Sequence, residues 1–207
     1  MTADTGIRSR MKAERPGQIL DAAFDEFVEK GFAAARVEDI ARTVGVTKGT
    51  VYVYFKDKEA LFEAVMEHAT KPKLEALSGL GVLNEGTCRE RLERFLRAFY
   101  TVVATDERSK KIFRLLFIEG HRDRAMADRF YEFSLMPFDE ILADILKQGV
   151  AAGEFRTTGG PEGPDIVLGP TISAMVCSML FGPSRQPDID RHIAAHLDLL
   201  FNGLMRR

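Results

Sequence analysis

Hydrophobic side chains recur at intervals of three and four residues along most of the chain, which is the spacing of one face of an α-helix. The clearest case starts after Pro16-Gly17 and ends at Gly31. Its apolar face is formed by Ile19, Leu20, Ala23, Phe24, Phe27 and Val28. No segment of useful length alternates apolar and polar residues as a half-buried strand does. The pattern predicts an all-α protein.

Two short helical patterns follow, separated by a glycine. The first covers about Val37–Val44, Gly45-Val46 turns the chain, and Thr47 caps a second helix that ends near Tyr54. Asp57 then caps a fourth, longer helix. Two helices of about eight residues joined by a tight glycine turn are typical of a helix-turn-helix.

Beyond about residue 70 the helical segments become longer. They are predicted at about 89–105, 109–120, 123–152, 164–181 and 188–205. Pro137 lies inside the third of these and predicts a kink or a break, whereas the Gly/Pro-rich stretch 157–164 is a predicted loop. We therefore expect about nine helices: a three-helix N-terminal domain, residues 1–60, and a larger bundle, residues 61–207.

Composition and charge narrow the class of protein. With 45% hydrophobic and 29% charged residues the chain is an ordinary soluble globular protein, and its net charge of −2 argues against indiscriminate nucleic-acid binding. Residues 1–15 carry four basic and two acidic side chains. This basic arm before the first helix is either a solubilising tail or an arm that seeks phosphates. No apolar run approaches 18 residues and no signal peptide is visible, so we expect a cytoplasmic protein.

The second short helix has an unusual composition for an element that must be stable. Gly49 alone should cost about 1 kcal/mol relative to alanine. The core of this region is predicted to contain Ile40, Val44, Val46, Val51 and Phe55. Lys48, Gly49, Tyr52 and Val53 then share the opposite face, as on a helix that enters a major groove. Thr50 and Lys48 lie in its first turn, the part of such a helix that meets base edges.

These segments resemble the DNA-binding domain of the tetracycline-repressor (TetR) family of transcriptional regulators. TKGTVYVYF followed by KDKEALF is similar to the recognition helix and the next helix of that family. ILDAAFDEFVEKGF and VEDIARTVGV are similar to its first two helices. The resemblance covers about residues 15–66, and the rest of the chain agrees only in its layout of helices.

The resemblance implies specific DNA contacts. Thr47 would cap the recognition helix and contact a phosphate, and Lys48 and Thr50 would contact bases or nearby phosphates. Tyr52 would lie against base edges or the backbone wall, while Tyr54 and Lys58 would contact phosphates. The full predicted DNA-binding set is Arg36, Glu38, Thr47, Lys48, Gly49, Thr50, Tyr52, Val53, Tyr54 and Lys58.

Two positions depart from the family pattern. Ala35-Arg36 stands where the family usually has a threonine or serine pair, which removes an N-cap and leaves Arg36 as a candidate phosphate contact. Glu38 stands where many relatives place a basic or polar base-reader. It either accepts a hydrogen bond from a cytosine amino group or is a solvated glutamate in the first turn of a helix.

A single helix-turn-helix buries too little DNA for useful discrimination, so we expect a homodimer on a palindromic operator. The resemblance implies that helices at about 164–181 and 188–205 pair with those of a second copy. The alternative is a purely intramolecular core.

Aromatic residues are concentrated in the middle helices. Each alone would be an ordinary core residue, but as a set they fit an apolar cavity with a few polar groups. The predicted effector pocket contains Phe95, Phe99, Tyr100, Phe113, Phe117, Glu119, His121, Tyr131 and Met136. His192 and His196 lack a third ligand nearby, and no nucleophile motif or phosphate loop is present. We therefore predict no catalytic site, no metal site and no cofactor.

The sequence as a whole predicts a ligand-responsive repressor that is released from its operator by a small, largely apolar effector. The alternative is a ligand-binding or scaffolding dimer that has lost specific DNA recognition.

Overall fold

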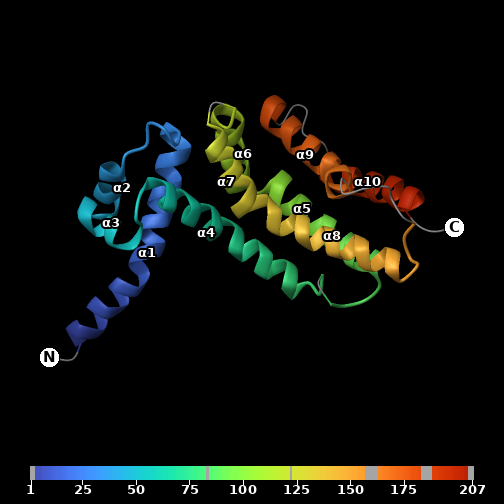
Figure 1. Cartoon of the computed structure of the whole chain (residues 1–207), viewed down its shortest axis with the longest axis horizontal. Coiled ribbons are helices and arrows are strands. Elements are labelled where there is room, and N and C mark those ends of the chain that lie inside the picture. Colours follow the sequence, from blue (N-terminus) through green and yellow to red (C-terminus); the bar gives the residue numbers. More distant parts are fainter. Residues whose placement is uncertain (1–2, 83, 122, 157–162, 183–187, 205–207) are drawn as a thin grey trace. The chain divides into compact units, whose positions relative to one another are not determined.

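We describe the fold from a computed structural model of the 207-residue chain (Figure 1). It describes residues 3–82, 84–121, 123–156, 163–182 and 188–204. The regular elements within these residues are all helical, which confirms the all-α prediction. They are α1 (Ala3–Lys30), α2 (Val37–Val44), α3 (Lys48–Tyr54), α4 (Lys58–Gly79), α5 (Cys88–Tyr100), α6 (Glu107–Glu119), α7 (Arg124–Phe130), α8 (Met136–Ala151), α9 (Gly163–Phe181) and α10 (Ile189–Leu204).

Two π-helical segments join some of these helices. Thr101–Thr105 continues α5, and Tyr131–Leu135 connects α7 to α8. Counted as continuous helical stretches, the described part of the chain contains nine, as expected.

The basic arm predicted for residues 1–15 is instead the beginning of the first helix, because α1 starts at Ala3 and runs through Pro16. Residues 10–15 read RMKAER, and all of these residue types have high helix propensity. A proline removes one backbone hydrogen bond, which kinks or breaks many helices but does not end this one.

The chain forms two compact units. One comprises residues 1–71 and 115–134, and the other comprises residues 72–114 and 135–207. The predicted domain boundary at residue 60 falls inside the first unit, in the first turn of α4. The first unit also includes the end of α6 and all of α7.

The first unit is held together by an aromatic cluster beside the helix-turn-helix. The rings of Phe27, Phe32 and Phe62 lie with centroids 5.0–5.6 Å apart, and all three side chains are buried. Ile40 of α2 and Val51 of α3 are fully buried as well. Truncating a buried phenylalanine of this kind typically costs about 3–5 kcal/mol.

Gly45 ends α2 in the left-handed conformation, with φ +74°, and its N–H is donated to the carbonyl groups of Ala41 and Arg42. A residue with a Cβ is disfavoured by about 1–2 kcal/mol in this conformation. The glycine therefore sets the tight turn that places α3 against α2.

The second unit is a helical bundle in which α5 packs against α8, α9 and α10. Its core is aromatic and aliphatic: the Phe95 and Phe99 rings stack at 5.8 Å, and Phe99 meets Phe138 at 5.4 Å. Leu142 and Ile145 of α8 are fully buried beside them.

The long helix predicted at residues 123–152 is interrupted near Pro137, as expected. The π-helical segment Tyr131–Leu135 precedes α8, and Pro137 lies in the first turn of that helix. Because proline has no N–H, it cannot bond to the carbonyl of Phe133. The wider π turn occurs where this bond is missing.

One described helix, α9, meets the length and composition of a membrane span, with a mean hydropathy of 1.5 over 18 residues. Glycine, proline, serine and threonine interrupt its apolar residues, so the helix passes on its average hydropathy and not on an unbroken apolar run. In a single chain 28% of that window is buried, and its other residues are half-buried or exposed.

Candidate functional site

The N-terminus of α3 is fixed by two threonines. The Thr47 hydroxyl oxygen accepts a hydrogen bond from the backbone N–H of Thr50 at 3.2 Å, which confirms Thr47 as the N-cap. The two hydroxyl groups also lie 2.9 Å apart and share a hydrogen bond. The cap therefore orients the Thr50 hydroxyl at the start of the helix.

The opposite faces of α3 differ as predicted. Val51 is 1% exposed, whereas Val53 is 81% and Tyr52 is 41% exposed. Lys48 and Gly49 are also exposed, and Thr50 and Tyr54 are half-buried. Of the other predicted core residues, Ile40 is fully buried, and Val44, Val46 and Phe55 are half-buried. A helix of seven residues thus presents a valine, a tyrosine, a lysine and a glycine to solvent.

An ion pair connects the two helices on this exposed face. Lys48 Nζ lies 2.5 Å from Glu38 Oε1, and it is 5.6 Å from the centre of the Tyr52 ring. The hydrogen bond from Lys48 lowers the pKa of Glu38, and the same bond raises the pKa of Lys48. In the free protein Glu38 is therefore a partner of the candidate base-contacting lysine.

The entry to α2 lacks a side-chain cap, as the replacement of the threonine or serine pair predicts. Arg36 occupies the N-cap position with an extended backbone and no capping side chain. Its backbone N–H is donated to Glu26 Oε1 at 3.3 Å, while its side chain is exposed. Ala35 is buried, so Arg36 is the member of this pair that can reach a ligand.

The Lys58 amine forms hydrogen bonds that were not expected for a residue predicted to contact a phosphate. Its Nζ donates hydrogen bonds to the carbonyl groups of Phe32, Ala33 and Ala35 at 2.8, 3.2 and 3.4 Å. It also lies 4.7 Å from the centre of the Phe32 ring. An ammonium group has three protons, and three carbonyls already receive them. In the free protein the Lys58 amine is thus tied to the α1–α2 loop.

The predicted effector residues belong to both compact units and differ in burial. Phe95, Phe99 and Tyr100 are fully buried in the core of the second unit, and Phe113 is buried there too. Phe117, Tyr131 and Met136 have exposed side chains, as has His121. The Glu119 side chain lies outside the described residues.

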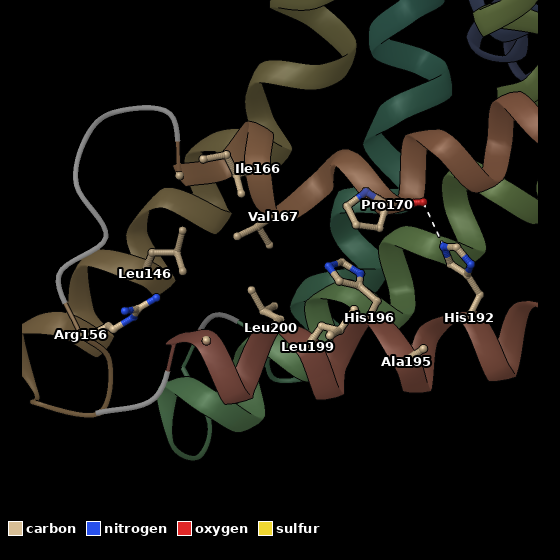
Figure 2. Close-up of a pocket in the computed structure, with 12 residues that line it drawn as sticks. Leu146, Arg156, Ile166, Val167, Pro170, His192, Ala195, His196, Leu199 and Leu200 are labelled. Atoms are coloured by element: carbon tan, nitrogen blue, oxygen red, sulfur yellow. Dashed lines mark hydrogen bonds between the residues drawn. The ribbon is translucent and has the colours of Figure 1, made fainter. Parts of the chain in front are cut away.

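A cavity of about 450 Å³ lies elsewhere in the second unit, between the ends of α8, α9 and α10 (Figure 2). None of the predicted pocket residues lines it. Its wall is mainly aliphatic, with Leu146, Val167 and Leu200 at its centre. Arg156 stands at one end, and His192 and His196 stand at the other. Helical periodicity provides no signal for Arg156, which follows a turn between two helices.

The two histidines have separate partners. His196 is buried, and its Nδ1 lies 2.9 Å from the Tyr100 hydroxyl. His192 Nε2 lies 3.2 Å from the Pro170 carbonyl oxygen. Burial, followed by the nearby His192, lowers the pKa of His196. No group of three or more histidine, cysteine or acidic side chains suited to a metal occurs among the described residues.

Two family models match the chain. One, for bacterial regulatory proteins of the tetR family, matches residues 19–65 and so includes α2 and α3. The other, for the C-terminal domain of AefR-like transcriptional repressors, matches residues 90–198, more than half of the chain. The chain belongs to the TetR family. It is a DNA-binding transcriptional regulator with a ligand-binding C-terminal domain, in a family of regulators and not of enzymes.

Individual TetR-family relatives agree with this assignment. The fatty acid metabolism regulator protein of Bacillus subtilis (strain 168) is 28% identical over 160 residues, which is 76% of this chain and 78% of that protein. The regulator RutR of Escherichia coli (strain K12) is 45% identical over 62 residues, only 30% of this chain and 29% of RutR.

Solved TetR-family structures show the same fold. A regulator from Mesorhizobium loti has a TM-score of 0.76 at 22% identity, covering 94% of this chain and 98% of that one. FadR from Bacillus subtilis, solved with stearoyl-CoA, has a TM-score of 0.73 at 23% identity, covering 90% and 97%.

Proposed function

We propose that this TetR-family protein is a cytoplasmic, homodimeric repressor that binds a palindromic operator through α3 and is released by a small, largely apolar effector. The observation that carries the proposal is the exposed face of α3. Val51 and the Thr47 cap fix the helix, and Lys48 and Tyr52 project from it into solvent. A short helix fixed in this way can enter a major groove about 12 Å wide.

We divide the DNA contacts by chemistry. Lys48 and Thr50 are proposed to contact bases or adjacent phosphates and Tyr52 base edges or the groove wall, with Gly49 and Val53 allowing close approach. Thr47, Tyr54 and Arg36 are proposed to contact phosphates, which set register and not sequence. Lys58 is assigned to hold the α1–α2 loop, because its amine already binds three carbonyl oxygens.

The proposed dimer interface is formed by α9 and α10. Ile166 and Leu180 of α9 are 73% and 70% exposed, and Leu199 of α10 is 75% exposed. Monomeric proteins seldom leave so many large apolar side chains uncovered on neighbouring helices. A second copy that pairs the same two helices would cover them and would place two copies of α3 on two half-sites.

The proposal of an effector rests on the second unit. The regulator from Bacillus subtilis was solved with stearoyl-CoA, and a TetR-fold regulator from Saccharomonospora viridis was solved with choline. This chain shares their fold and has a mainly aliphatic cavity in the matching C-terminal region. We infer that its effector binds in that domain and weakens operator binding by linkage.

Footprinting of the DNA that flanks the protein's own gene tests the repressor proposal. We expect two protected half-sites about 34–36 Å apart, one helical turn of DNA. Thr50→Ala and Lys48→Ala should alter base preference, whereas Glu67→Gln, an exposed charge change on α4, serves as the control. If no symmetric protection is found on any flanking DNA, the scaffolding alternative is favoured.

A further inference from the structure

The cavity between α8, α9 and α10 has a charge at one end only. Leu146, Val167 and Leu200 line it, and the guanidinium group of Arg156 is directed toward Leu146 (Figure 2). No described carboxylate forms an ion pair with Arg156. An aliphatic wall beside one guanidinium group is the chemistry that receives an amphipathic anion.

The Arg156 side chain is exposed, but the backbone that leads to it is anchored by the two residues before it. The Glu154 carboxylate accepts hydrogen bonds from the backbone N–H groups of Cys88 and Arg89, each at 3.1 Å, at the start of α5. Phe155 is 2% exposed and packs against Gly149, where a Cβ would overlap its ring. With both preceding side chains fixed, little backbone freedom remains to be lost when Arg156 binds a ligand.

The other end of the cavity is formed by the two histidines. The Pro170 carbonyl can only accept, so His192 carries its proton on Nε2 and donates it there. His196 is buried, which disfavours its charged form. Its Nδ1 is hydrogen-bonded to the Tyr100 hydroxyl, and its ring borders the cavity beside Pro170 (Figure 2). A second anionic group on the ligand would meet no lysine or arginine among the described residues at this end.

We propose that this cavity binds an aliphatic monocarboxylate, with the carboxylate on Arg156 and the chain along Leu146, Val167 and Leu200. The proposal deepens the repressor function argued above and rests on it for the ligand's role as effector. It moves the effector away from the aromatic residues of α5, which form a closed core.

The size of the cavity sets the length of the chain. About 450 Å³ corresponds to roughly 15 water-sized volumes of about 30 Å³ each. Decanoate, with twelve heavy atoms, fits this volume and fills most of it. Palmitate, with eighteen heavy atoms, exceeds roughly 15 such volumes at one per heavy atom, so we expect the affinity to be highest at medium chain length.

The cavity also borders the proposed dimer face. Ile166 and Leu199 line it and are at the same time 73% and 75% exposed. A ligand that contacts these two side chains changes the surface that the second copy would cover. Binding of the carboxylate and pairing of the two copies must therefore affect each other's free energy by the same amount.

Isothermal titration calorimetry of the full chain with decanoate, below its micelle concentration, tests the site. Arg156→Gln removes the charge and should weaken binding at least about tenfold, because a hydrogen bond to a charged group is lost. Arg191→Gln, an exposed charge change on α10 outside the cavity, is the matched control and should bind like the natural protein. Circular dichroism melting shows whether both variants are folded.

The choice of probes separates the possible ligand classes. Decanol and decylamine should bind more weakly than decanoate, and decanedioate should also bind more weakly because its second carboxylate meets no lysine or arginine at the histidine end. The inference is overturned if decanol binds as tightly as decanoate, or if Arg156→Gln leaves decanoate binding unchanged.

A mobility-shift assay with operator DNA distinguishes failure of this inference from failure of the repressor proposal. Release of DNA by decanoate in the natural protein, but not in Arg156→Gln, supports both. Arg156-dependent binding without release overturns the effector role alone. If the free protein binds no operator at all, the repressor proposal fails while calorimetry still decides the cavity.

Discussion

Replacing Glu38 with glutamine should strengthen DNA binding and make it more sensitive to salt. In the free protein the Glu38 carboxylate holds the Lys48 amine at 2.5 Å. A DNA contact by Lys48 must break or share this pair, and it brings an exposed carboxylate toward the phosphates. Glutamine keeps the shape of the side chain and removes the charge, so Lys48 becomes free to neutralise a phosphate.

The size of the effect follows from counterion release. Each phosphate neutralised on duplex DNA adds about 0.9 to the slope of log affinity against log salt. One additional contact in each protomer steepens the slope of a dimer by about 1.8. Between 50 and 200 mM salt, a fourfold rise, the variant should lose about twelvefold more affinity than the natural protein over the same range.

Fluorescence anisotropy with operator DNA and with a scrambled duplex, at four salt concentrations, measures both quantities. Glu67→Gln carries the same charge change on α4 and should leave the slope nearly unchanged. The double variant Glu38→Gln with Lys48→Ala should not show the increase in salt slope, because the Lys48 amine that would contact the phosphate has been removed.

An unchanged slope in Glu38→Gln would refute the idea that Glu38 restrains Lys48. A loss of discrimination between operator and scrambled DNA, with the slope unchanged, would instead show that Glu38 contacts a base. The two outcomes cannot be confused, because one is read from salt dependence and the other from sequence dependence.

Three further predictions concern other parts of the chain. Lys58→Met should weaken binding to all DNA sequences severalfold while leaving the salt slope unchanged; a loss of about one slope unit per protomer would show a direct phosphate contact instead. Leu180→Glu should shift the protein from dimer to monomer in sedimentation, because it places a charge on the apolar surface of α9. Burial keeps the pKa of His196 below its usual 6.5, so the unfolded chain takes up this proton first. The free energy of unfolding should therefore fall as the pH drops below about 6.5, more steeply in the natural protein than in His196→Gln, as measured by denaturant melts from pH 8 to 5.5.

The helix-turn-helix could be predicted because its determinants are local. The Thr47 cap lies three residues from the N–H that it accepts, and Gly45 sets its turn within five residues of chain. The exposed and buried faces of α3 follow from helical spacing alone, since Val51 needs only Ile40 and its neighbours to define the inner side.

Features that depend on contacts between residues far apart in the chain could not be predicted from the sequence. Lys58 is separated by more than twenty residues from the carbonyls that it binds, and no spacing rule links them. Composition correctly marked Phe95 and Phe99 as apolar, but it could not tell a closed core from a cavity wall. Arg156 reaches the cavity because Glu154 and Phe155 are fixed by α5 and α8, which is a tertiary effect.

The chain passes between its two compact units inside continuous helical stretches, and two of these passages are marked by proline. One lies in α4 at residues 71 and 72, where Pro72 interrupts the backbone hydrogen bonds of the helix. Another lies at residues 134 and 135, at the end of the π-helical segment and just before Pro137. Helices bend most readily where such a bond is missing. We therefore expect ligand binding in the second unit to affect α2 and α3 through bending of the two connecting helical stretches at Pro72 and Pro137, and not through a rigid-body shift of a straight helix.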